Sequence, residues 1–145
     1  MFGVPFKNLG LFSAVYIGAL AVSMAILFWL RVQFDFDAGS TGTWIASFAA
    51  SCIVAGQSYA KSSNWTWSRE DRRNLAMAYA AASSVIGLVL AIPYMAFDPR
   101  GFGELASFWG LFILVFGGLF GTLISYALAR FLLGRVVRQK NPQAQ

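Results

Sequence analysis

Four long apolar stretches constrain the fold of this chain more than any other feature. They cover residues 9–30, 43–60, 75–97 and 108–128. A helix needs about 20 mostly apolar residues to cross a bilayer, and only helices or closed barrels satisfy their own backbone groups there. None of the stretches alternates apolar with polar residues as a barrel strand does. The sequence therefore predicts an all-α integral membrane protein, a bundle of four transmembrane helices.

Composition and chain length agree with this prediction. The 145 residues are 58% hydrophobic and only 12% charged, whereas soluble proteins are roughly 25% charged. The first stretch contains a crude signal-cleavage sequence at residues 19–21, but its apolar character continues to Leu30. Since a signal peptide has an apolar region of about 7–15 residues, we interpret the stretch as a membrane helix.

The connections between the stretches are short, which indicates one transmembrane domain over residues 1–138 and a polar tail over 139–145. The last helix is expected to continue beyond 128 as an amphipathic segment to about 138. At 100° per residue, the cations of this segment occupy one arc and its aliphatic residues the opposite arc, a pattern able to lie along a membrane surface. The cations are Arg130, Arg135 and Arg138, and the aliphatic residues are Leu132, Leu133, Val136 and Val137.

The distribution of basic residues predicts the orientation. With four spans, the N-terminus, the loop at 61–74 and the C-terminus share one side, which holds nine of the 11 Lys and Arg residues. Cytoplasmic flanks collect such residues. We therefore predict a multi-pass protein of a bacterial-type inner membrane with both termini cytoplasmic. Tryptophan prefers the headgroup level, and three tryptophans fall at predicted outer helix ends: Trp29, Trp44 and Trp109.

The segment SREDRRNL, residues 68–75, concentrates charge in the predicted cytoplasmic loop. Ser68 and Asp71 have the spacing of a capping box, so the third helix is expected to begin near Arg69. This segment is interpreted as a helix cap and topology determinant whose cations reach anionic headgroups, with a docking site for a cytosolic partner as the alternative. The predicted membrane-surface residues are Arg69, Arg72, Arg73, Arg130, Arg135 and Arg138.

Small residues spaced four apart mark helix-packing faces in membranes. The fourth stretch carries the longest such series, which begins with a GxxxG motif. Whether these faces pack within the chain or against another chain stays open. The predicted packing residues are Gly117, Gly121, Ser125 and Ala129 in the fourth stretch, Cys52 and Gly56 in the second, and Ser83 and Gly87 in the third.

The chain lacks the residues that several classes of function need. The chain has no His and a single Cys, so we expect no metal, no cofactor and no enzymatic activity. The predicted spans contain no charged residue, whereas ion-coupled transporters usually carry one facing their pathway. The basic residues follow helix ends and accompany no recognised nucleic-acid-binding motif, so a nucleic-acid partner is not expected.

The segment CIVAGQSYAKSSNWTWSREDRRNLAMAYAAASSVIG, residues 52–87, resembles a family of small, uncharacterised bacterial inner-membrane proteins with four predicted spans. The matching residues are Ala55, Gly56, Glu70 and Leu75, while Trp67 and Ser68 stand where the family has a proline. The resemblance covers about a quarter of the chain, and it implies a membrane location and no chemistry.

These observations favour a non-enzymatic scaffold or accessory subunit that docks through its small-residue faces to itself or to a larger membrane complex. The alternative is a small oligomeric transporter or channel without charged coupling residues in the membrane. Flux in liposomes that depends on Gln57 or on the hydroxyl groups of the spans would distinguish the two.

Overall fold

The chain folds into four long helices in the computed structural model, which describes residues 5–35, 40–63, 68–97 and 108–140. The helices are α1 (Phe6–Phe34), α2 (Ser40–Ser62), α3 (Arg69–Phe97) and α5 (Phe108–Lys140). The all-helical fold is confirmed, and each helix contains one of the four predicted stretches. Trp65 and Trp67 of the predicted inner loop lie outside the described residues.

Three of these helices are long and apolar enough to cross a membrane. The qualifying segments are Phe6–Phe34, Arg69–Leu90 and Val115–Val136. Helix α2 forms over the predicted second stretch but is not among them, because small and hydroxyl-bearing residues lower its hydropathy. Within the described residues, three candidate spans are therefore present, and membrane crossing by α2 stays a prediction.

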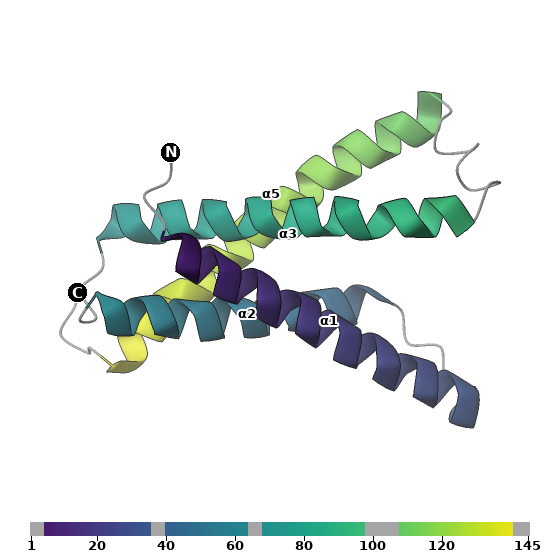
Figure 1. The fold of residues 1–145 in the computed structure, drawn as a ribbon. Helices are drawn as coiled ribbons and strands as arrows, with labels where there is room; N and C mark the ends of the chain where they lie inside the picture. The colour runs from purple at the N-terminus through teal and green to yellow at the C-terminus, as the bar shows by residue number, and fades with distance from the viewer. Residues whose placement is uncertain (1–4, 36–39, 64–67, 98–107, 141–145) are drawn as a thin grey trace.

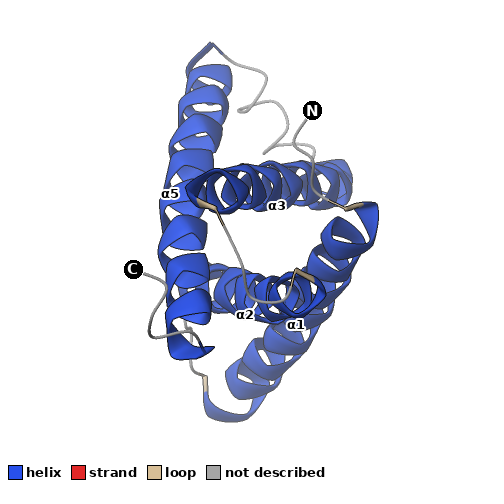
Figure 2. Ribbon diagram, turned by 90° about the vertical axis from the view of Figure 1, so that its left-hand side faces the viewer, coloured by secondary structure: helices blue, strands red, loops and turns tan. Residues whose placement is uncertain are grey.

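The helices form a closed ring in which α1 contacts α2 and α3, and α5 also contacts α2 and α3. Helices α2 and α3 run nearly level in Figure 1, whereas α1 and α5 are inclined to them in opposite senses, as Figure 2 also shows. Successive helices run in opposite directions along the bundle (Figure 1). The helices are closest near the middle and towards the end that holds the start of α1, and α1 and α5 diverge at the other end (Figure 1).

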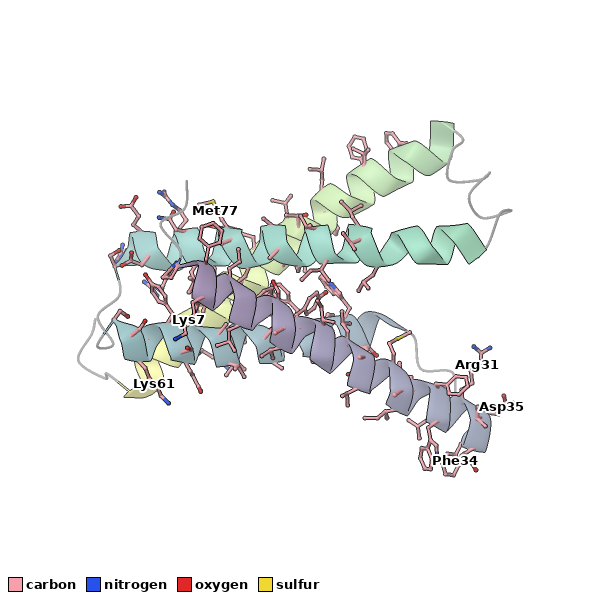
Figure 3. All side chains as sticks on the ribbon, in the orientation of Figure 1. Lys7, Arg31, Phe34, Asp35, Lys61 and Met77 are labelled. Carbon is pink, nitrogen blue, oxygen red and sulfur yellow. The ribbon has the colours of Figure 1, made fainter. Side chains whose placement is uncertain are left out.

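Charge marks the two ends of the bundle. Lys7 and Lys61 lie at one end, and Arg31 and Asp35 lie at the other (Figure 3). We call the first the basic end, because the start of α3 with Arg69 and the last turns of α5 lie there too (Figure 1). This separation of charge by an uncharged middle is the pattern that a membrane-spanning bundle requires.

The core lies in the half of the bundle next to the basic end. Residues from all four helices meet there, including Phe12 of α1, Phe48 of α2, Tyr79 of α3 and Leu133 of α5, all at 0% exposure. Further along, large apolar side chains are exposed on all four helices, Ile45 of α2 among them. They include Val22 and Phe28 of α1, Val85 and Leu88 of α3, and Phe116 and Leu119 of α5.

The end of α5 differs from its predicted role. The helix continues without interruption to Lys140, but two residues of its aliphatic arc are buried in the bundle instead of lying free for a membrane surface. Leu133 belongs to the buried core and Val136 is 5% exposed, while Arg130 and Arg135 face outwards. Leu133 and Val136 pack inside the bundle because α2 and α3 extend far enough to cover them (Figure 1).

Candidate functional site

A buried polar contact joins three helices near the basic end. Asn8 of α1 is 6% exposed, and its Nδ2 donates a hydrogen bond of 2.8 Å to the carbonyl oxygen of Ala55 on α2. The hydroxyl of Tyr79 on α3 donates a hydrogen bond to Oδ1 of the same side chain. One amide therefore uses both its donor and its acceptor to hold α1, α2 and α3 together, as a buried polar group requires.

Aromatic rings surround this contact. The ring of Phe12 stacks on that of Tyr79 with centroids 4.4 Å apart, and it meets Phe48 edge-on at 5.8 Å. Tyr16 contacts Phe12 and Phe48, and Trp44 stacks on Phe48 at 6.0 Å. Trp44 thus packs on the aromatic core, whereas Trp29 is exposed at the far end of α1.

The predicted packing residues divide into a buried and an open group. Cys52, Gly56, Ser83, Ser125 and Ala129 are buried between helices. Ser125 Oγ turns back to the carbonyl oxygen of Gly121 on its own helix at 2.8 Å. These small side chains lie where the four helices are closest.

The remaining glycines of the series are open. Gly87 and Gly117 are exposed and Gly121 is half-buried. Among the described residues, no atom of another helix lies within 4 Å of the position that a Cβ would take at any of the three. Between α3 and α5, a hydroxyl contact of 2.8 Å joins Ser84 to Thr122 beside this open region. The GxxxG motif is therefore not used for close packing within the part of the chain that the structure describes.

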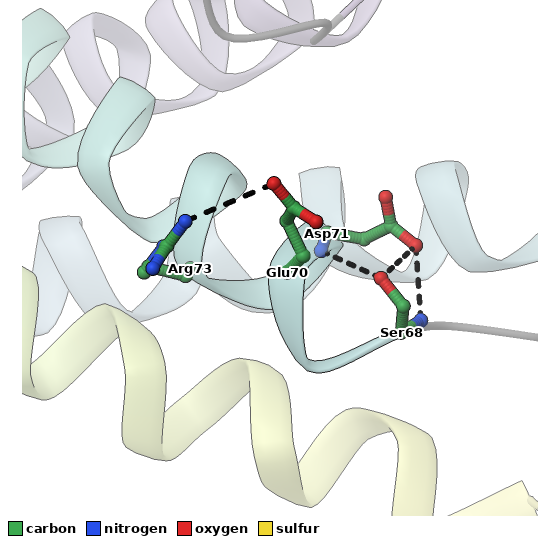
Figure 4. A network of polar contacts seen from close by, with 4 residues as sticks. All are labelled: Ser68, Glu70, Asp71 and Arg73. Carbon is green, nitrogen blue, oxygen red and sulfur yellow. Dashed lines mark hydrogen bonds and ion pairs between the residues drawn. The ribbon is translucent and has the colours of Figure 1, made fainter.

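Ser68 and Asp71 cap the start of α3 (Figure 4). The Asp71 N–H donates to Ser68 Oγ at 3.0 Å, and the Ser68 N–H donates back to Asp71 Oδ2 at 2.9 Å. The reciprocal pattern is that of a capping box. It begins the helix at Arg69 and satisfies N–H groups that a helix start leaves without partners.

The arginines near the basic end have different surroundings. Arg73 lies 3.8 Å from Glu70, and both side chains are more than half exposed. Arg72 is half-buried and reaches α5. Its Nη1 lies 3.6 Å from the position that a Cβ atom would take at Gly134. Arg135 lies over the ring of Phe131 at 4.5 Å. Arg69 and Arg130 are exposed, and the side chains of Arg138 and Trp109 lie outside the described residues.

Pockets open between helices at two places in the described part of the chain. One of about 440 Å³ lies between the start of α1 and the end of α2. The other, of about 330 Å³, lies between α3 and α5 and is almost entirely apolar. The first is lined by Pro5, Lys7, Asn8, Leu11, Ser58, Tyr59 and Ser62, and the second by Met77, Ala80, Ala81, Thr122, Leu123 and Tyr126.

Asn8 and Tyr79 are not among the predicted site residues, and neither is any residue that lines the first pocket. Asn8 precedes the first apolar stretch and so resembles a polar flank of a membrane helix. The available signal was its spacing of four residues from Phe12, which places the amide and the ring on one helix face. The chain was also compared with protein-family models, curated proteins and solved structures, and none of these matches it.

The structure presents two candidate binding surfaces. The pocket at the basic end presents an ammonium group and hydroxyl groups, which suits an anion. The open glycines of α5 present backbone at the surface of an apolar helix, which suits the close approach of another helix.

Proposed function

We propose that this chain is a small, non-enzymatic inner-membrane protein that acts as a scaffold or accessory subunit. In this proposal all four helices cross the membrane, the basic end faces the cytoplasm, and the protein docks to a second copy or to a larger membrane complex through α5. The observation that carries the proposal is the open GxxxG motif of Gly117 and Gly121.

Acyl chains pack well against some helix surfaces, and a second helix packs better against others. Large exposed side chains such as Phe116 and Leu119 are well solvated by acyl chains, and they need no protein partner. A glycine face gains little from lipid, but it lets a second backbone approach closely enough for extensive van der Waals contact. The C-terminal members of the same series, Ser125 and Ala129, are buried against the other helices of the chain.

Replacing Gly121 by leucine tests the proposal. Because the position is open towards other helices, Gly121→Leu is expected to leave the fold of the chain intact while it blocks the approach of a partner helix. The matched control is Gly10→Leu on α1, where the glycine is exposed and equally open but lies on a helix that the proposal does not assign to docking.

The measurement is the size and composition of the particle purified in mild detergent from the native membrane. We expect Gly121→Leu to lose co-purifying chains, with the Gly10→Leu particle and the helical content of both variants unchanged. Identical particles for Gly121→Leu and the unsubstituted chain would refute docking through α5.

A further inference from the structure

One lining residue of the pocket between α1 and α2 is held in place by hydrogen bonds to two other helices. Asn8 lines it, and the amide of this residue is held by Ala55 on one side and Tyr79 on the other. Both hydrogen bonds join different helices, so the pocket is a product of the folded bundle. Its volume of about 440 Å³ falls within the roughly 300–1,000 Å³ of ligand pockets, which are usually pre-formed in this way.

The electrostatics of this pocket favour an anion. Lys7 supplies a positive charge, and none of the described lining residues is acidic. The nearby Asp71 carboxylate acts on the lining residue Tyr59, on the α2 side of the pocket. The first turn of α1 contains no acidic residue, and Pro5 makes no capping hydrogen bond through its side chain. The partial positive charge of the helix start is therefore added to that of the lysine.

A second cation lies at the same end of the bundle, on the helix that supplies the other wall of the pocket. Lys61 follows the lining residue Ser58 by three positions on α2, and residues three apart are neighbours on a helix surface. Figure 3 shows Lys7 and Lys61 at the same end of the bundle. Lys7 thus lines a pocket that also contains the hydroxyl groups of Ser58 and Ser62, and Lys61 is a neighbour of Ser58 on α2.

The pocket is polar at one side and apolar at the other. Leu11 belongs both to the lining and to the uncharged stretch 9–30, whereas Lys7 precedes that stretch. In a membrane this boundary lies at the level of the lipid headgroups, where lysine side chains extend towards the aqueous phase. A ligand that fits both sides carries a phosphate next to an apolar part.

We propose that this pocket binds an anionic phospholipid. Its phosphate contacts the ammonium groups of Lys7 and Lys61 and accepts a hydrogen bond from Ser58, and its glycerol and upper acyl segments lie against Leu11. The proposal rests on the membrane location of the chain and is independent of docking through α5.

The experiment uses the purified full-length chain in mild detergent, titrated with phosphatidylglycerol or with phosphatidylcholine, and counts retained lipid by native mass spectrometry. We expect retention of phosphatidylglycerol over phosphatidylcholine. Lys7→Gln is expected to weaken phosphatidylglycerol retention about fivefold, as one surface cation does, and the added change Lys61→Gln to weaken it further. The control Arg130→Gln removes a cation near the same end of the bundle without touching the pocket, and it should have no effect.

Two further arms separate the pocket from general charge and the lipid from free phosphate. Ser58→Phe keeps the charge but fills the pocket, and it should abolish selective retention. Inorganic phosphate should not displace the lipid at matched concentration. Equal losses in Lys7→Gln and Arg130→Gln, unchanged retention in Ser58→Phe, or displacement by phosphate would each overturn the proposal. Particle size in the same samples reports on α5 docking separately.

Discussion

The ring of Phe12 on α1 lies parallel to the ring of Tyr79 on α3, with centroids 4.4 Å apart and planes inclined by 7°. The hydroxyl of Tyr79 donates a hydrogen bond to Oδ1 of Asn8. Asn8 lies one helical turn before Phe12 on α1. A single tyrosine therefore joins α1 through both its face and its polar tip. This double contact fixes the axial position of α3 against α1, because sliding α3 would break the stack and leave Asn8 Oδ1 without its donor.

Removal of the Tyr79 hydroxyl tests the polar half of this contact. Tyr79→Phe keeps the ring but leaves Asn8 Oδ1 unpaired in a buried site. An unsatisfied buried acceptor costs about 1–3 kcal/mol, and cross-helix hydrogen bonds in membranes average about 0.6 kcal/mol. We expect a loss of about 1 kcal/mol in the free energy of unfolding, measured by denaturant titration in detergent. The half-buried Tyr126 gives the control Tyr126→Phe, which should change it by a few tenths at most.

A double variant separates the hydrogen bond from ring packing. Asn8→Leu removes the amide, and when it is combined with Tyr79→Phe no side chain of the pair keeps an unpaired polar atom. Replacing both partners is often nearly neutral, so the combined loss of stability should be smaller than the sum of the two single losses. A strictly additive result would mean that the two side chains are not coupled.

Loss of the capping box at the start of α3 should destabilise that helix locally. Ser68→Ala removes the acceptor that lies 3.0 Å from the Asp71 nitrogen, and loss of an N-cap costs about 1 kcal/mol. Hydrogen exchange of the first-turn amides of α3 should become faster, while exchange in α1 stays unchanged. Glu70→Gln is the matched control, because its exposed ion pair with Arg73 is of a kind that contributes little. Equal exchange rates in both variants would argue against the cap.

The sequence predicts the helices well because each signal for them is local. The length of the apolar stretches, the charge at their ends and the SxxD spacing of residues 68–71 all act within one helix. The order of the helices around the ring, α1, α2, α5 and α3, has no such signal. Helices that face lipid are apolar on all sides, so the pattern does not indicate which side of each helix meets a neighbour.

The candidate sites show the same division. The small-residue series predicts faces for close packing, but only the bundle geometry decides that Ser125 is covered and Gly117 is open. The pocket at the basic end depends on the approach of α1 to α2. Its residues Lys7 and Ser58 are 51 positions apart in the sequence, so no local motif joins them.

Gly134 offers a stabilising substitution. A methyl group there would meet only Arg72 Nη1, at an ordinary contact distance of 3.6 Å, and alanine is favoured over glycine in a helix by about 0.5–1 kcal/mol. Gly134→Ala should therefore raise the unfolding free energy by about 0.5 kcal/mol. The bulkier Gly134→Leu must displace the arginine and should gain less. Destabilisation by alanine would indicate that α5 and α3 approach each other more closely than the structure shows.

The crossing of the membrane by α2 can be tested with single cysteines at the two ends of the bundle. Phe34→Cys places an exposed thiol at the end of α1, and Ser62→Cys places one at the end of α2. The native Cys52 is 0% exposed and should not react with a maleimide until the protein unfolds. If α2 spans the membrane with the basic end inside, a membrane-impermeant maleimide applied to intact cells will label position 34 and not position 62. Permeabilised cells provide the control, since both positions should then react.

Labelling of both positions in intact cells would place the two ends of α2 on one side of the membrane. The chain would then have only the three spans of α1, α3 and α5, and the four-span topology would be refuted.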